Sequence, residues 1–229
     1  MSDFKTNRFG KVVLTGPFKY PRLNEPDDKF AKDGFGHYSV KVVLPADDEH
    51  CAALIAQIDA AWEENLEIFR ASLPPAKAKK LIGADKPYRP EEDKETGEET
   101  GNIEFNCKMK AGGKSNGRVW TQSPDLFDAQ MSRLTETIGG GTVGRVSCFL
   151  SGWNSPNPKV GAGVSLKLRG VQVISLEHGH GSPEDMGFEV EEDGFVTDGV
   201  DRSAQAAPVT VPDDDESVEG DEGDGEEFE

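Results

Sequence analysis

The chain has 229 residues and a formal net charge of −18, from 43 acidic and 25 basic side chains. Residues 184–229 hold nineteen of the acidic residues and one basic residue, so residues 1–183 are neutral overall. The negative charge therefore does not exclude a surface for nucleic acid on the first part of the chain. Three widely spaced cysteines, an odd number, exclude a framework of disulfides and favour a reducing compartment.

Length and polarity predict one domain and a tail. Residues 1–183 are enough for a single domain with its own core, whereas residues 184–229 are too polar and self-repelling to bury one. We expect the domain to span 1–183 and a disordered acidic tail to span 184–229. No signal peptide is recognisable in residues 1–8, and no segment approaches the roughly 20 apolar residues that cross a bilayer. A soluble, intracellular protein is expected.

The first half of the domain alternates between strand and helix patterns. Residues 12–14 and 38–44 are rich in β-branched and apolar side chains and predict strands. Residues 17–22, between them, predict a loop in which aromatic and basic side chains alternate. The apolar residues of 47–73 follow a helical period, which predicts one long amphipathic helix with Asp47 as its cap and two prolines after it.

The second half predicts mainly strands. After a basic stretch, the charged residues 91–102 favour a mobile loop. Residues 103–110 alternate as a strand, and residues 117–121 are its expected hairpin partner. Two further strands are expected at 143–150 and 164–176, with a short helical segment before the glycines at 139–141. Five or six strands with one long helix predict a mainly β fold, a small closed barrel instead of a doubly wound sheet.

Motifs for catalysis or metal binding are missing from the sequence pattern. Residues 111–115 resemble part of a phosphate-binding loop, but Lys108 stands where that pattern needs glycine, and the segment joins two strands. His178 and His180 are only half of a metal site. No nucleophile, base and orienting carboxylate occur at a recognisable spacing. We expect no enzymatic activity, no cofactor and no metal site.

Aromatic residues stand among basic residues in four separate clusters. Single-stranded nucleic acid needs that mixture, because unpaired bases stack on rings while phosphates need cations. Any one cluster is more typical of a core aromatic beside a solvated lysine, and a strand tryptophan such as Trp120 especially so. Four clusters, mostly in predicted loops, favour DNA binding. The candidate DNA contacts are Phe18, Lys19, Tyr20, Arg22, Tyr88, Arg89, Lys108, Lys110, Arg118, Trp120, Trp153 and Lys159.

The tail carries a second predicted site. Residues 213–229 contain eleven carboxylates, no lysine or arginine, and a single aromatic residue next to the end. A lone apolar residue in such a segment favours docking to a partner with a basic patch and an apolar pocket. The candidate partner contacts are Asp213, Asp214, Asp215, Glu216, Glu226, Glu227 and Phe228.

Nearly the whole chain resembles a known family, the single-stranded DNA-binding proteins of the T-odd coliphage replication type. Cys51 and Trp62 of the predicted helix take part in the resemblance. The other segments that carry it, in order, are PFKY at 17–20, YSVKVVLP at 38–45, KPY at 86–88, FNC at 105–107, IGGG at 138–141, WN at 153–154, VGAGVSLKL at 160–168 and VEEDGFV at 190–196.

The resemblance implies an oligonucleotide-binding (OB) barrel whose groove holds single-stranded DNA, with a long helix between the second and third strands. It also implies work in phage DNA replication, recombination and repair in the cytoplasm of an infected bacterium. Implied partners are the phage DNA polymerase and helicase-primase, through the tail, and a second copy in a homodimer. Two features depart from the family: Glu229 follows Phe228, and Asn106 replaces a lysine whose charge moves to Lys108 and Lys110 on the same strand face.

Two other functions stay open. An acidic DNA mimic or inhibitor would bind a DNA-handling enzyme through its tail. A metal-dependent nuclease would use carboxylates of the domain. Salt-sensitive binding to oligo-dT, binding to proteins only, and metal-dependent cleavage distinguish the three.

Overall fold

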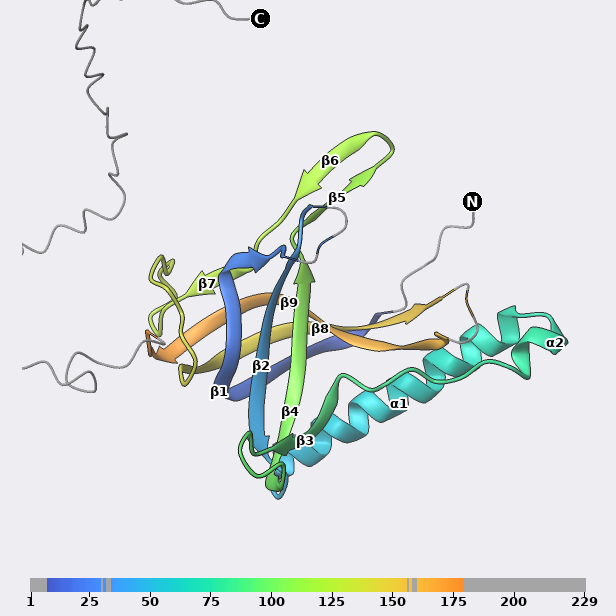
Figure 1. Cartoon of the computed structure of the whole chain (residues 1–229), viewed down its shortest axis with the longest axis horizontal. Coiled ribbons are helices and arrows are strands. Elements are labelled where there is room, and N and C mark those ends of the chain that lie inside the picture. The colour runs from blue at the N-terminus through green and yellow to red at the C-terminus, as the bar shows by residue number, and fades with distance from the viewer. Residues whose placement is uncertain (1–7, 30, 32–33, 156, 158–159, 179–229) are drawn as a thin grey trace, which may run out of the picture. The chain divides into compact units, whose positions relative to one another are not determined.

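The computed structural model describes residues 8–29, 31, 34–155, 157 and 160–178. Nine strands and two helices occur in this part of the chain (Figure 1). The predicted fold class, mainly β with one long helix, is confirmed. The predicted tail lies outside the described residues, so the domain boundary stays a prediction. None of the described helices is long and apolar enough to cross a membrane.

Five strands close into a barrel. The sheet order is β3-β4-β2-β1-β8-β9-β7, and β4 pairs in addition with β9. This last contact is parallel and sets Cys107 opposite Leu166 and Lys108 opposite Lys167. The small closed barrel predicted from the sequence is thus present. The strands of the closed ring are β1 (Arg8–Asp27), β2 (His37–Pro45), β4 (Glu99–Lys110), β8 (Val143–Asn154) and β9 (Ala162–Ser175).

The barrel core follows from alternation along these strands. Successive side chains of a strand point to opposite faces, and the inward set is apolar throughout. Phe18, Phe105 and Leu150 are among the largest fully buried side chains. All three cysteines, each buried, are free thiols, as their odd number and spacing indicate.

Two short strands extend the sheet at its ends, where the sequence pattern was misread. β3 (Tyr88–Glu92) pairs with β4, and β7 (Asp125–Phe127) pairs with β9. Residues 91–102, predicted as a mobile loop, form the end of β3, a turn and the start of β4. The charges that suggested a loop are explained by the solvent on both sides of this edge hairpin. The short helix expected directly before Gly139 is not present, since residues 122–138, all of which the structure describes, contain no helix.

The long helix α1 (Glu49–Ser72) lies between β2 and β4 in the chain. Its cap is Asp48, one residue after the predicted Asp47, because the Asp48 carboxylate accepts a hydrogen bond from the His50 amide at 2.7 Å. A second helix, α2 (Pro75–Ala78), follows at once, and both reach past the barrel strands (Figure 1). Buried Asn65 ties α1 to the barrel by donating to the carbonyls of Trp153 (3.0 Å) and Gly163 (2.9 Å).

A separate hairpin, here called the arm, projects from the barrel (Figure 1). It consists of β5 (Gly112–Ser115) and β6 (Arg118–Thr121), joined at Asn116 and Gly117. Both turn residues have positive φ, 50° and 75°, as two-residue hairpin turns with Asn-Gly require. The predicted pairing of 103–110 with 117–121 is therefore wrong: 103–110 pairs with β2, and the nearest Asn-Gly turn decides the hairpin.

The first predicted loop is also a strand. Residues 17–22 continue β1, which runs without interruption from Arg8 to Asp27. The register with β2 shifts between Lys19 and Arg22, and Tyr20 within this irregularity has a φ of 49°. A bulge of this kind keeps the residues in the sheet while turning single side chains out of the regular alternation.

We predict that Asn65→Ala lowers the free energy of unfolding by about 1–3 kcal/mol, because it removes two hydrogen bonds from a buried site. Urea denaturation with a single probe of the barrel measures this. Glu64→Ala, at the exposed neighbouring position, is the control and is expected to stay within about 0.5 kcal/mol of the wild type. Equal stability of both variants would show that the amide does not hold the helix to the barrel.

Candidate nucleic-acid interface

A line of basic side chains runs around the outside of the barrel. Cys107, Cys148 and Leu166 are buried, and each directly precedes a residue of this line in the chain. Since successive side chains of a strand alternate between faces, the side chains of the line point outwards. Neighbouring strands lie about 4.8 Å apart, so the line places cations in close succession. Its members, each directly opposite the next on the neighbouring strand, form the basic row: Arg22, Ser39, Lys108, Lys167, Phe149 and Lys11.

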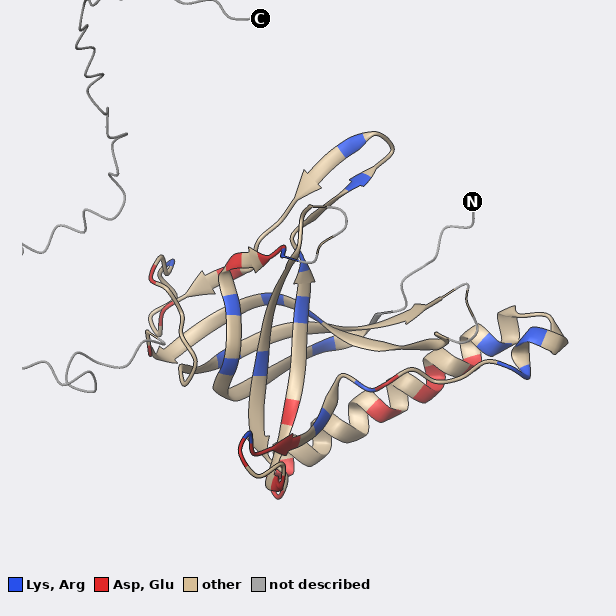
Figure 2. Cartoon of the chain, viewed as in Figure 1, with Lys and Arg blue, Asp and Glu red and all other residues tan. Residues whose placement is uncertain are grey.

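The basic row passes a groove under the arm. This arm groove has a volume of about 650 Å³ and combines side chains of the barrel with Trp120 of the arm. The Arg169 guanidinium lies 5.0 Å from the centre of the Phe149 ring, which fixes a cation against an aromatic face. Figure 2 shows basic residues on the barrel strands and the arm, and acidic residues along α1, near β3, at one end of β1 and around β7. The groove residues used below are Lys108, Lys110, Trp120, Phe149, Lys167 and Arg169.

A smaller hollow of about 360 Å³ adjoins the arm groove. Arg169 and Asp125 line both hollows. The smaller hollow adds Lys11 and Arg145 as cations and Phe127 as a ring. Each of the two hollows therefore combines rings with cations.

A buried carboxylate organises a second cluster of cations. Glu104 on β4 is only 5% exposed and accepts from Lys41 at 2.7 Å and from Arg89 at 3.1 Å, with Lys19 at 3.2 Å. Burial raises the pKa of Glu104, but the hydrogen bonds from these cations outweigh it, and the pKa is lowered. Lys19 also binds Glu91 at 2.6 Å. Lys19 and Arg89, both predicted DNA contacts, are thus already held in internal ion pairs.

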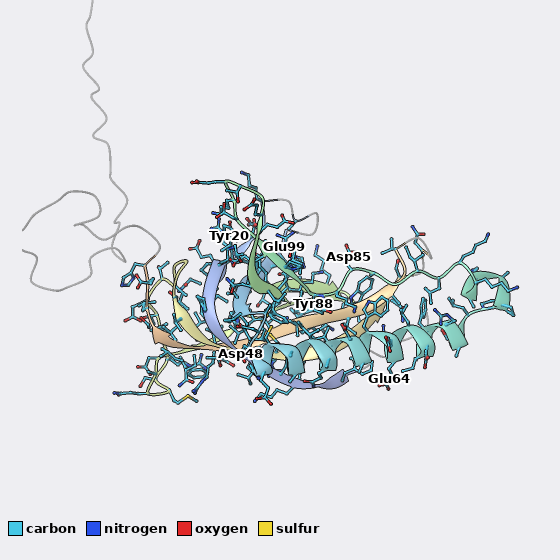
Figure 3. All side chains as sticks on the ribbon, turned by 90° about the horizontal axis from the view of Figure 1, so that it is seen from below. Tyr20, Asp48, Glu64, Asp85, Tyr88 and Glu99 are labelled. Atoms are coloured by element: carbon cyan, nitrogen blue, oxygen red, sulfur yellow. The ribbon has the colours of Figure 1, made fainter. Side chains whose placement is uncertain are left out.

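The two predicted tyrosines lie beside this cluster. Tyr20 is 52% exposed, with the Lys94 ammonium 4.8 Å from its ring centre, and its pKa is lowered mainly by a hydrogen bond with Lys94. Tyr88 is half-buried and lies beside α1 (Figure 3). It donates to Asp59 of α1 at 2.8 Å and packs against Phe105. Tyr88, with Lys41 and others, lines a further hollow of about 510 Å³. Both rings are close to cations.

The remaining predicted contacts divide between the core and the surface. Phe18 is 1% exposed and packs in the core, where a side chain on Gly144 would touch its ring, so its inclusion among the DNA contacts was wrong. Trp153 is half-buried, with its ring against Gly163. Arg118 and Trp120 are exposed on the arm. Lys159 and the seven predicted tail contacts lie outside the described residues.

Several site residues were missed because they are neighbours only across strands. Lys167, Arg169 and Phe149 carry no local motif, and they meet Lys108 only when β9 pairs with β4 and β8. The signal in the sequence was alternation: Lys167 lies between buried Leu166 and Leu168, and Arg169 follows Leu168. A search for clusters adjacent along the chain passes over such residues.

Comparisons with known proteins support the resemblance seen in the sequence. No family model matches the chain. The single-stranded DNA-binding protein of Escherichia phage T7 is 28% identical over 222 residues, which cover 91% of this chain and 90% of that protein. The crystal structure of the single-stranded DNA-binding protein encoded by bacteriophage T7 superposes with a TM-score of 0.57 and 24% identity, covering 82% of this chain and 100% of that chain.

A phage protein of the same description gives a weaker superposition. The single-stranded DNA-binding protein of bacteriophage Enc34 in complex with single-stranded DNA has a TM-score of 0.48 and 17% identity, covering 75% of this chain and 90% of that chain. The predicted resemblance to phage single-stranded DNA-binding proteins is confirmed by the T7 relative. That protein is described by binding and not by catalysis, which supports the prediction of a non-enzymatic protein.

We predict an acid-sensitive contribution of Glu91 to stability. Hydrogen bonds from Lys19 first, and then from Thr100 and Asn102, lower its pKa from 4.5 to about 2. A carboxyl group whose pKa is lowered in the folded protein stabilises the fold at pH values above its ordinary pKa. This stabilisation is lost as the pH falls from about 4.5 to about 2. The difference in free energy of unfolding between wild type and Glu91→Gln should therefore shrink across that window in denaturant titrations.

Glu92→Gln serves as the control for this measurement, since Glu92 is the exposed neighbour on the same strand. Its difference from the wild type is expected to stay small at every pH. A constant difference between wild type and Glu91→Gln from neutral to acid pH would contradict the assigned ion pair.

Proposed function

We propose that this protein binds single-stranded DNA in phage DNA replication and coats exposed template strands. The observation that carries the proposal is the basic row, in which four of six cross-strand neighbours are cations and one is an aromatic ring, and which runs into the arm groove. Proteins that bind single strands without sequence preference combine a basic groove along the backbone with rings that stack on bases. The similarity to the T7 protein supports the same function.

The roles of the groove residues follow from their chemistry. Lys108 and Lys167 lie opposite each other on β4 and β9, where their ammonium groups can meet successive phosphates. Trp120 and Phe149 supply faces for unpaired bases, and Arg169 beside Phe149 adds a cation at the stack. The proposed binding is thus through charge and stacking, without readout of base edges.

The second cluster extends the proposed path across β1, β2 and β4. Tyr20 and Tyr88 offer partly exposed rings, and Lys41 and Arg89 line the hollow beside Tyr88. Because Glu104 neutralises part of this positive charge, we propose that the second cluster attracts phosphate less strongly than the basic row does. Arg22 links the two regions, since it belongs to the basic row and follows Tyr20 on β1.

We further propose that the acidic tail recruits replication proteins. Residues 213–229 are too negative to bind DNA themselves, so a partner with a basic patch and an apolar pocket fits them best. The phage DNA polymerase and helicase-primase are the proposed partners of the tail. Separately from the tail, a second copy of the chain is a proposed partner in a homodimer. The cytoplasm of the infected bacterium is the place where these components meet.

The alternatives have less support. A DNA mimic would bind its target through the tail alone, and this function would not use the basic row. A nuclease needs a metal site, and among the described residues no group of three or more His, Cys, Asp or Glu side chains could hold a metal ion. The proposal is tested by titrating the tryptophan fluorescence of the full chain with oligo-dT. Binding that weakens with salt supports it, whereas no binding, or metal-dependent cleavage of the oligonucleotide, overturns it.

We predict that Lys108→Ala reduces the slope of log affinity against log salt concentration by about 0.7, the value for one phosphate contact of a single strand. The same titration at several salt concentrations measures it. Lys79→Ala is the matched control, because it removes the same charge from an exposed position beside α2. If both variants keep the wild-type slope, Lys108 does not contact the backbone.

We predict that Phe228→Ala weakens binding of the full chain to the phage DNA polymerase, because the ring fills the apolar pocket of the partner. DNA affinity is expected to be unchanged. Val218→Ala, another apolar truncation in the acidic segment, is the control and should bind polymerase as the wild type does. Undiminished polymerase binding by Phe228→Ala in surface plasmon resonance would refute the docking role of the ring.

A further inference from the structure

We propose that the arm is a selectivity element that admits single-stranded DNA to the arm groove and keeps duplex DNA out. The inference rests on the proposed function and assigns to the β5–β6 hairpin a role for which its sequence contains no motif. It depends on three features: the two unlike faces of the arm, the rigid seat at its base, and the limited space beneath it.

The two faces of the arm differ in chemistry. Gly113 lies opposite Trp120 and Ser115 opposite Arg118, while Lys114 lies opposite Val119. Residues directly opposite in an antiparallel pair share a face, and successive pairs alternate between faces. Trp120 lines the arm groove, so the face with Trp120 and Arg118 is the groove side. Lys114 and Val119, which is 61% exposed, belong to the other face.

The base of the arm is seated on both sides. The Trp120 ring lies over Gly113, where a β-carbon would come within 2.9 Å of a ring atom. A β-carbon on Gly112 would come within 2.4 Å of the Phe35 ring. The absence of side chains at the two glycines therefore allows the rings of Trp120 and Phe35 to pack directly against β5. Gln122 closes the base of the arm, because its backbone N–H donates to the Ala111 carbonyl at 2.8 Å.

The space beneath the arm suits nucleotides of one strand. Its volume of about 650 Å³ is enclosed by Trp120 on the arm and by Phe149, Lys167 and Arg169 on the barrel. Sites of about 300–1,000 Å³ hold single small molecules, so a few unpaired nucleotides match it in size. A base can enter between Trp120 and the barrel only when its faces are unstacked, as in a single strand.

Duplex DNA meets the same features as obstacles. Its bases are paired and stacked, so Trp120 and Phe149 gain no stacking contact from it. The arm projects from the barrel beyond the end of β4 (Figure 1), and its Trp120 lines the groove beside the cations of β4 and β9, which limits the approach of a rigid double helix from that side. The arm groove therefore favours single strands by stacking and disfavours duplexes by exclusion, which is discrimination by both attraction and repulsion.

Shortening the arm tests the proposal. Gly112 and Thr121 lie opposite each other, so Asn-Gly in place of residues 113–120 closes the base with a two-residue hairpin turn. Affinities of the full chain and this variant are measured for oligo-dT and for a blunt duplex of equal length. We expect the preference for the single strand to fall by about tenfold or more, the effect of one lost stacking contact together with easier access for the duplex.

Two point variants provide matched charges on opposite faces of the intact arm. Arg118→Ala and Lys114→Ala each remove one cation, so their general electrostatic effects are equal. Arg118→Ala is expected to lower the preference for single strands about threefold to tenfold, while Lys114→Ala changes affinity for both DNAs in the same proportion. These variants decide the question even if the shortened arm impairs folding.

The outcomes separate the two proposals. A full chain that does not bind oligo-dT overturns the proposed function and this inference with it. A full chain that binds oligo-dT, together with an unchanged preference in the folded shortened variant, overturns only the role of the arm. Identical behaviour of Arg118→Ala and Lys114→Ala likewise overturns the assignment of its groove face.

Discussion

The parallel contact between β4 and β9 determines the rest of the structure. Without it the sheet would be an open ribbon, and the outward residues of β4 and β9 would lie at opposite edges. The contact joins them through two residue pairs, Cys107 with Leu166 on the inside and Lys108 with Lys167 on the outside. One side of the closure is therefore core packing, and the other side is the centre of the basic row. The same alternation that buries the thiol of Cys107 exposes the ammonium of Lys108.

The two basic regions of the surface differ in how their charge is balanced. Around Glu104 the protein supplies its own anion, and Lys19, Lys41 and Arg89 are held by it. A buried carboxylate between several cations fixes side-chain positions at a cost in desolvation. The basic row crosses the same barrel at other positions, and none of these ion pairs of Glu104 includes Lys108 or Lys167. The charges around Glu104 are thus partly neutralised by a buried anion of the protein itself.

Elements with a strong local pattern could be predicted from the sequence, and contacts between distant strands could not. The helix of 47–73 and the strands at 38–44, 143–150 and 164–176 follow clear periods and are present with small differences at their ends. The partner of residues 103–110 was mispredicted, because strand pairing depends on the whole sheet while a hairpin pattern is local. Residues 17–22 resembled a loop in the sequence, and the register of β1 against β2 does shift within them, between Lys19 and Arg22.

The candidate site shows the same division. Lys108, Lys110, Arg118 and Trp120 were recognised because basic and aromatic residues adjoin in the chain, and they line or border the arm groove. Phe18 was included by the same criterion, although strand alternation turns its ring into the core. Lys167 and Arg169 come from a segment that shows only alternation. Adjacency along the chain therefore finds part of a barrel surface, and cross-strand register is needed for the remainder.

The basic row also sets function against stability. Lys108 and Lys167 are like charges on directly opposite positions, an arrangement that weakens a sheet relative to a neutral or oppositely charged pair. This pair of lysines belongs to the β4–β9 contact that closes the barrel. The neighbouring pair of that contact, Cys107 and Leu166, is buried in the core and holds the two strands together. Local rules of stability are broken most often at sites of function. A bound anion between the two ammonium groups would relieve their repulsion, so the strongest attraction for a phosphate should lie at the closure of the barrel.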